Sequence, residues 1–98
     1  MIATIGIIQN KKPVNVKVLY TKGDQLKGMK AYKKCKEAPQ YLIFPKPNNV
    51  FTMKGVKFPV KIIGVKEGKV IYERIHLPEE EIINLPNPDL VIESPICN

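Results

Sequence analysis

Apolar residues along this chain recur mostly at the two-residue spacing of β-strands rather than at helical spacing. Segment 14–20 is the clearest example, because alternate positions are apolar: Val14, Val16, Val18 and Tyr20. Such alternation predicts a half-buried antiparallel strand. The apolar segment 2–8 precedes it and ends at a short polar, proline-containing run. We therefore expect 2–8 and 14–20 to form a hairpin.

Further short strands are predicted where apolar runs are bounded by glycine, proline or asparagine. These runs are 41–44, 50–54, 58–66, 69–77 and 90–93. Glu67 and Gly68 separate two of them and predict a tight hairpin turn. The acidic, proline-flanked stretch 78–88 is expected to be a connection with at most one turn of helix.

Only residues 21–40 carry a helical pattern. Leu26, Met29 and Tyr32 follow one another at three-residue spacing, as on one face of a helix, and Pro39 lies beyond its expected end. The 98 residues are the length of one domain. The pattern as a whole predicts a mainly β domain over residues 1–98, a compact antiparallel sandwich or barrel-like fold with one short helix.

Charge is unevenly distributed along the chain, whose net charge is +7. Residues 1–61 hold 13 lysines and two acids, a balance of +11, whereas residues 62–98 have a balance of −4. Such asymmetry can mark a surface that binds polyanions. The single arginine argues against this interpretation, since arginine is preferred for bidentate phosphate contacts. If nucleic acid binds, the expected residues are Lys30, Lys33, Lys34 and Tyr32.

The two cysteines, Cys35 and Cys97, lack the spacing of a metal or redox motif. No secretory signal or run of transmembrane length is recognised, so we expect a cytoplasmic protein that is a monomer or weak dimer. Two free thiols are then expected, with one bridge as the alternative.

Residues for catalysis are scarce. The chain has one histidine, His76, and one serine, Ser94, and it has no glycine-rich phosphate loop. His76 is expected to be structural or to face solvent. The acids 79–81 could bind a hard cation, but Ca²⁺ needs six or more converging oxygens. We therefore expect them to form a solvated turn. We expect no catalytic residue, no metal site and no cofactor.

The order of several short motifs resembles the prokaryotic family called domain of unknown function 192. That family has a Gly-Leu-Met segment after a short helix, a Leu-Phe strand, a Phe-Trp-Met-Lys-Asn-Thr strand, a strand-Gly-strand hairpin and a final apolar strand with Glu. The resemblance covers roughly residues 14–93. Matching positions are Gly28 and Met29, 42–45, Phe51, Met53 and Lys54, Pro59, Gly68, and 91–93. The resemblance implies a compact β-rich fold, and the family has no settled activity.

Departures from the family pattern fall in segment 51–61. Thr52 stands where the family has Trp, Gly55-Val56 replaces Asn-Thr, and Lys61 replaces an Asp. If the family strand lines a pocket, this chain has lost a carboxylate there and gained positive charge, which either shifts ligand preference toward anions or abolishes the site. A structural strand and bend is the main interpretation of this segment. The alternative is a shallow ligand-binding cleft formed by Lys54, Lys57, Pro59 and Lys61.

Three functions are consistent with these observations. The first is a small non-catalytic binding or accessory protein with a basic groove for an anionic ligand. The second is a nucleic-acid-binding protein that uses the lysine-rich face of residues 1–61. The third is an enzyme with an unrecognised constellation around Lys54, His76 and Glu93.

Overall fold

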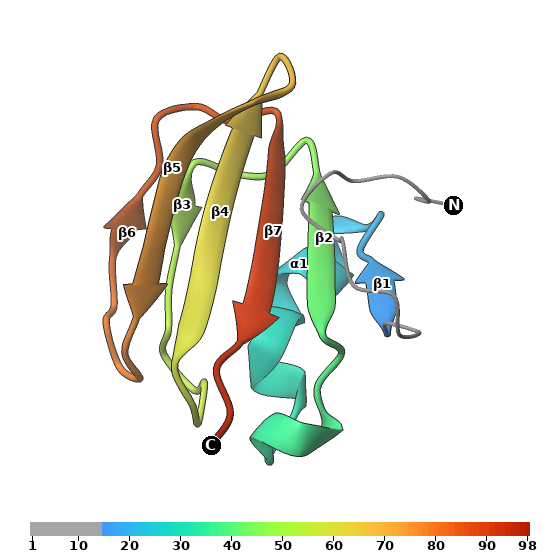
Figure 1. Cartoon of the computed structure of the whole chain (residues 1–98), viewed down its shortest axis with the longest axis vertical. Coiled ribbons are helices and arrows are strands. Elements are labelled where there is room, and N and C mark those ends of the chain that lie inside the picture. The colour runs from blue at the N-terminus through green and yellow to red at the C-terminus, as the bar shows by residue number, and fades with distance from the viewer. Residues whose placement is uncertain (1–14) are drawn as a thin grey trace.

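A mixed sheet of five strands forms the body of the protein in the computed structural model, which describes residues 15–98. The strand order is β1-β2-β7-β4-β5 (Figure 1). The bounds are β1 Val16–Val18, β2 Tyr41–Pro45, β7 Leu90–Pro95, β4 Val60–Lys66 and β5 Lys69–His76. The sheet is open, with β1 and β5 as its edges, so the mainly β prediction is confirmed and the barrel is not.

All the remaining elements pack on one face of this sheet. They are α1 Lys22–Lys27, the 3-10 helices η1 Gly28–Ala31 and η2 Cys35–Glu37, and the two-stranded sheet of β3 Val50–Phe51 and β6 Ile83–Asn84. In Figure 1, α1 and β3 lie behind the large sheet. The main core forms between these layers, where Met29 and Ile83 meet Phe44, Ile62 and Val91 of the sheet.

The three central strands β2, β7 and β4 are buried on both faces, which explains their nearly continuous apolar sequences. Phe44, Ile62 and Val91 face the main core, whereas Ile63 and Ile92 belong to a second, smaller cluster on the other face. Side chains of a strand point alternately to its two faces, so a polar residue within such a strand must also become buried.

The hairpin of β4 and β5 is the most local part of the fold and was predicted correctly. Glu67 and Gly68 form its two-residue turn, and both have positive φ angles, 52° and 76°. This is the backbone of a type I′ turn, whose twist matches that of the flanking strands. The ladder shifts register between Gly64 and Val65, where Tyr72 packs over the glycine.

Several predicted elements differ from those in the structure. β1 is shorter than segment 14–20 and pairs in parallel with β2, so the sheet is mixed rather than antiparallel. The predicted partner strand 2–8, and with it the hairpin, lies outside the described residues. Stretch 78–88 is not a plain connection, because buried Ile83 brings β6 beside β3. The predicted strand 50–54 is ordered as a strand over Val50–Phe51 only.

The helical prediction is confirmed, although the helix is short and irregular. Thr21 caps α1, since its side-chain oxygen accepts a hydrogen bond from the Asp24 backbone nitrogen over 3.0 Å. Gly28 ends α1 with a positive φ of 45°, and the 3-10 helix η1 follows directly. Met29 is buried as the spacing predicted, but Leu26 is 67% exposed and borders a pocket instead of the core.

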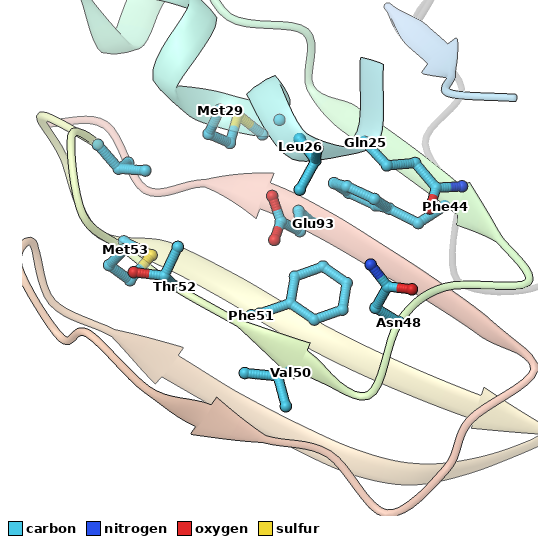
Figure 2. Close-up of a pocket in the computed structure, with 12 residues that line it drawn as sticks. Gln25, Leu26, Met29, Phe44, Asn48, Val50, Phe51, Thr52, Met53 and Glu93 are labelled. Carbon is cyan, nitrogen blue, oxygen red and sulfur yellow. The ribbon is translucent and has the colours of Figure 1, made fainter. Parts of the chain in front are cut away.

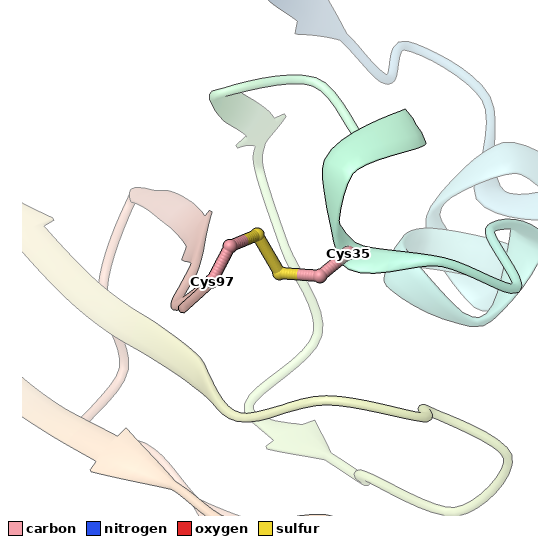
Figure 3. Close-up of a disulfide and its surroundings, with 2 residues drawn as sticks. All are labelled: Cys35 and Cys97. Carbon is pink, nitrogen blue, oxygen red and sulfur yellow. A yellow bond between two sulfur atoms is a disulfide. The ribbon is translucent and has the colours of Figure 1, made fainter.

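A disulfide joins Cys35 of η2 to Cys97, just beyond β7 (Figure 3). The prediction of free thiols was therefore wrong. The two cysteines are 62 residues apart, and only the fold, which places η2 beside the end of β7, brings them together. The predicted cytoplasmic location stays a prediction, although disulfides persist mainly in oxidising compartments. No helix within residues 15–98 is long and apolar enough to cross a membrane.

Candidate functional site

A pocket of about 80 Å³ lies between the helical segment and β3, on the core side of the large sheet. We call it the Glu93 pocket, after its one acidic residue (Figure 2). Its walls come from α1 and η1, from β2 and the turn after it, from β3 and the loop that follows, and from β7. The lining residues are Gln25, Leu26, Gly28, Met29, Phe44, Asn48, Val50, Phe51, Thr52, Met53, Val56 and Glu93.

Glu93 is placed in the pocket by the alternation of β7. Val91 and Glu93 point to the core side of the sheet and Ile92 to the other side. The flanking strands place Leu42 and Ile62 opposite Glu93, so its neighbours in the sheet are apolar. Glu93 is only 6% exposed, and Figure 2 shows its carboxyl pointing into the space between α1 and Phe51.

Among the residues that the structure describes, the Glu93 carboxyl lacks the partners that usually accompany a buried acid. Across residues 15–98, no backbone or side-chain group donates a hydrogen bond to it. Burial removes water from the charged form and raises the pKa of Glu93 to about 8. At neutral pH the group is therefore mostly a neutral carboxylic acid, which can both donate and accept a hydrogen bond.

The helical wall of the pocket is held in place by Gln25. Its Nε2 donates hydrogen bonds of 2.9 Å to the backbone oxygens of Leu19 and Pro45, which ties α1 to the ends of β1 and β2. Gly28 then lets the chain approach Glu93. Its φ is 45°, and a Cβ there would lie 3.5 Å from the Phe44 ring and 3.9 Å from Glu93 Oε1.

Aromatic rings form the opposite part of the lining. Phe44 and Phe51 meet edge to face, with ring centroids 5.2 Å apart. Thr52 follows Phe51 and is exposed, and its Oγ1 accepts a hydrogen bond from the Lys54 backbone nitrogen. The hydroxyl hydrogen of Thr52 remains available to a ligand, because hydroxyl groups can donate and accept at once. The pocket is thus apolar with a few polar groups, as small-molecule sites usually are.

A second polar cluster lies on β5 and the loop after it. Tyr72 Oη lies 2.6 Å from Nε2 of buried His76, and Nδ1 of His76 lies 2.9 Å from Glu80 Oε2. Glu80 also accepts a hydrogen bond from the Leu77 backbone nitrogen. The hydrogen bonds from His76 and then Leu77 lower the pKa of Glu80. Of the two expectations for His76, exposure to solvent is therefore wrong, since the ring is buried and bonded at both nitrogens, and Glu80 of the acidic run is one of its partners.

The predicted ligand residues are not all brought together. Lys54, Lys57 and Pro59 share the loop from β3 to β4, and both lysines are exposed. Lys61 lies within β4 on the other face of the sheet, where its Nζ is 2.6 Å from Glu73 Oε2. There it borders a separate hollow of about 230 Å³.

The predicted nucleic-acid residues lie around η1 and η2. Lys30, Lys33 and Lys34 are exposed, and the Lys30 side chain packs beside Gly55 of the loop after β3. Tyr32 is half-buried and packs against the main core, so one side of its ring is already covered.

No metal-binding group of three or more His, Cys, Asp or Glu side chains occurs within residues 15–98. The comparisons with known proteins give no further guide: no family model, curated protein or solved structure matches the chain. The resemblance to the domain of unknown function 192 family therefore stays a prediction. Several of the positions that carry it meet at one place, since six of them line the pocket: Gly28, Met29, Phe44, Phe51, Met53 and Glu93.

Glu93 is the residue whose role sequence reasoning undervalued. The sequence pattern marked Glu93 only as the end of the family resemblance and as one of three residues in the enzyme hypothesis. The structure separates that set, because His76 is bonded to Tyr72 and Glu80 and neither His76 nor Lys54 lines the Glu93 pocket. An acid directly after three apolar residues of a strand was the available signal, since such strands are buried on both faces.

Proposed function

We propose that this protein is a small non-catalytic binding domain whose ligand enters the Glu93 pocket. The observation that carries the proposal is the buried Glu93 carboxyl, which faces the pocket and has no hydrogen-bond donor within residues 15–98. No fully buried side-chain nitrogen or oxygen of residues 15–98 lacks a hydrogen-bond partner, so the remaining exposed surface of Glu93 is the part that opens to the pocket. A carboxyl in a cleft whose pKa is raised by desolvation is a candidate for a functional site.

Binding is favoured over catalysis by the composition of the pocket lining. Glu93 is its only titratable residue, and the lining contributes no cysteine, histidine or lysine among the described residues. Covalent catalysis requires a nucleophile with an adjacent base. One neutral carboxyl among phenylalanine and methionine side chains can recognise a ligand, but it supplies neither half of such a pair.

The basic groove enters this proposal as the surface next to the pocket. Lys54 and Lys57 follow Thr52 in the same loop, and Lys30 packs against that loop at Gly55. These exposed lysines would attract acidic parts of a ligand that extend beyond the pocket. Lys61 is not part of this surface, because it pairs with Glu73 on the opposite face of the sheet.

Nucleic-acid binding remains the alternative proposal and is tested by salt dependence. If Lys30, Lys33 and Lys34 neutralise phosphates, affinity for labelled single-stranded RNA should fall steeply with added salt. The packing of Tyr32 against the core weakens this alternative, since stacking needs an accessible ring face.

A fragment screen by ¹H–¹⁵N NMR tests the binding proposal. The pocket is blocked in Thr52→Trp, whereas Val70→Trp adds the same ring at an exposed position of β5 outside the pocket lining. We expect small neutral fragments to shift amide signals around Gly28, Thr52 and Glu93 in the wild type and in Val70→Trp, and not in Thr52→Trp. Equal shifts in both variants, or none in the wild type, would reject the Glu93 pocket as a binding site.

A further inference from the structure

The Glu93 pocket selects the chemistry of its ligand through one group, because Glu93 is the only ionisable side chain that residues 15–98 contribute to its lining. We propose that the ligand presents an uncharged carboxamide, whose carbonyl oxygen accepts a hydrogen bond from the Glu93 carboxyl and whose N–H donates one back to it. This inference rests on the proposed function and specifies its ligand. A carboxamide suits the site because its carbonyl and N–H match the donor and acceptor of a carboxylic acid.

The surroundings of Glu93 keep other charges away from it. Its neighbours across β2 and β4 are Leu42 and Ile62, and the segments over it contribute Gly28, Met29 and Phe51. Charged residues do occur on the packed elements, but none of them lines the pocket: Lys22, Asp24 and Lys27 of α1, Lys30 of η1, Lys54 after β3, and Lys61 and Lys66 of β4.

Two electrostatic effects disfavour a cationic ligand. An ammonium group would require Glu93 to ionise, and both charges would then be desolvated, which offsets much of their attraction. The protein also has a net charge of +7, which repels cations as they approach. An anionic ligand would enter the same apolar lining with no cation to meet it there. A neutral group with a hydrogen-bond acceptor avoids all of these costs.

The size of the pocket limits how much of the ligand enters. Its volume of about 80 Å³ is roughly half that of a cavity of about 150 Å³ that binds benzene. A carboxamide with a short alkyl group fits this space. Such a group can belong to a free small molecule or to a glutamine or asparagine side chain of a peptide, and both sources offer the same chemistry to Glu93.

The protonation state of Glu93 gives the inference a measurable signature. Burial raises the pKa of Glu93 to about 8, so the donor is present at pH 7 and largely lost at pH 9. A ligand that requires the protonated form should bind about tenfold more weakly at pH 9 than at pH 7, because each pH unit above the pKa removes a factor of about ten. A cationic ligand should show the opposite trend.

NMR titrations with three fragments of equal size test this directly: propionamide, propionate and n-butylamine, each at pH 7 and pH 9. Fragments this small bind weakly, with dissociation constants expected at about the millimolar level. Propionamide should bind best and lose about tenfold at pH 9. In Glu93→Gln its affinity should not vary with pH, and in Glu93→Leu it should fall at least tenfold. Glu81→Gln, an exposed acid outside the pocket, is the matched control and should behave as the wild type.

Failure of this inference can be told apart from failure of the proposed function. Tighter binding of n-butylamine or propionate at the pocket, or pH-independent binding of propionamide to the wild type, overturns the carboxamide assignment and leaves a binding pocket. Absence of all three fragments from the pocket overturns both. A glutamine-containing tripeptide and its leucine analogue separate the two sources, since only a peptide ligand would gain affinity over propionamide.

Discussion

Replacing Glu93 with glutamine should change how the stability of the protein depends on pH. The carboxyl titrates with a pKa of about 8 in the folded protein and near its ordinary value of 4.5 in the unfolded chain. The folded state therefore binds more protons between these values, and the free energy of unfolding falls as pH rises. The favourable contribution of the protonated acid is complete below pH 4.5 and is lost as pH rises through 8.

The size of this effect follows from the pKa difference. One pKa unit corresponds to about 1.4 kcal/mol, so the free energy of unfolding should fall by about 3 kcal/mol between pH 5 and pH 8 because of Glu93 alone. That is a large share of the roughly 5–15 kcal/mol by which domains of this kind are stable. Glutamine has a similar shape and stays neutral, so Glu93→Gln should lack this loss and should be the more stable protein at pH 8.

Urea denaturation at fixed ionic strength, from pH 5 to pH 8, provides the measurement. The informative quantity is the difference in unfolding free energy between wild type and Glu93→Gln, because the other titrating groups cancel in it. Glu81→Gln serves as the control, since Glu81 is exposed and its replacement should leave the pH profile within about 0.5 kcal/mol of the wild type. Parallel pH profiles for wild type and Glu93→Gln would refute the argument that Glu93 is buried as a neutral acid.

Three other substitutions test features of the fold. Replacing both Cys35 and Cys97 by serine should lower the unfolding free energy by about 4 kcal/mol, from the entropy of a 62-residue loop, and an unchanged urea midpoint would contradict this. Gly28→Ala should lower the free energy of unfolding by about 1–2 kcal/mol because the φ of Gly28 is 45°, whereas the control Gly23→Ala within α1 should raise it by about 0.5–1 kcal/mol. The two variants should therefore shift the thermal unfolding midpoint in opposite directions. Shifts of the same sign would contradict the backbone conformation at Gly28. Tyr72→Phe leaves the buried His76 Nε2 without its partner and should lower the free energy of unfolding, measured by urea denaturation, by about 1–3 kcal/mol. An unchanged free energy of unfolding would contradict a stabilising Tyr72–His76 hydrogen bond.

The elements that depend on local signals were predictable from the sequence. The β4–β5 hairpin is an example, since Glu67 and Gly68 lie between two apolar runs and their φ angles are those of a type I′ turn. The parallel pairing of β1 with β2 was not predictable, because the segment between them supplies the crossover only once its irregular helices fold. β6 was missed because two residues are too few to show alternation, and Ile83 is buried through contacts distant in sequence.

The candidate site was harder to predict than the fold because its residues come from four separate parts of the chain. The charge of Lys54 and Lys57, near Thr52, is evident from the sequence, but both lysines lie on the surface. Glu93 becomes unusual only when β2 and β4 enclose its strand and Gly28 brings the helical segment above it. The pKa of Glu93 is raised by desolvation, and desolvation depends on tertiary packing. The sequence alone therefore gives little indication of it.

The bridge between Cys35 and Cys97 also makes one covalent ring of most of the described chain, because every strand from β2 to β7 lies within it. A protease that cuts the exposed turn at Asn48 and Asn49 would therefore release no fragment. The two pieces would stay joined and would separate on a denaturing gel only after reduction. Nicking of this kind would break the short chain segment between the pocket residues Phe44 and Phe51, which would then stay connected only through the disulfide.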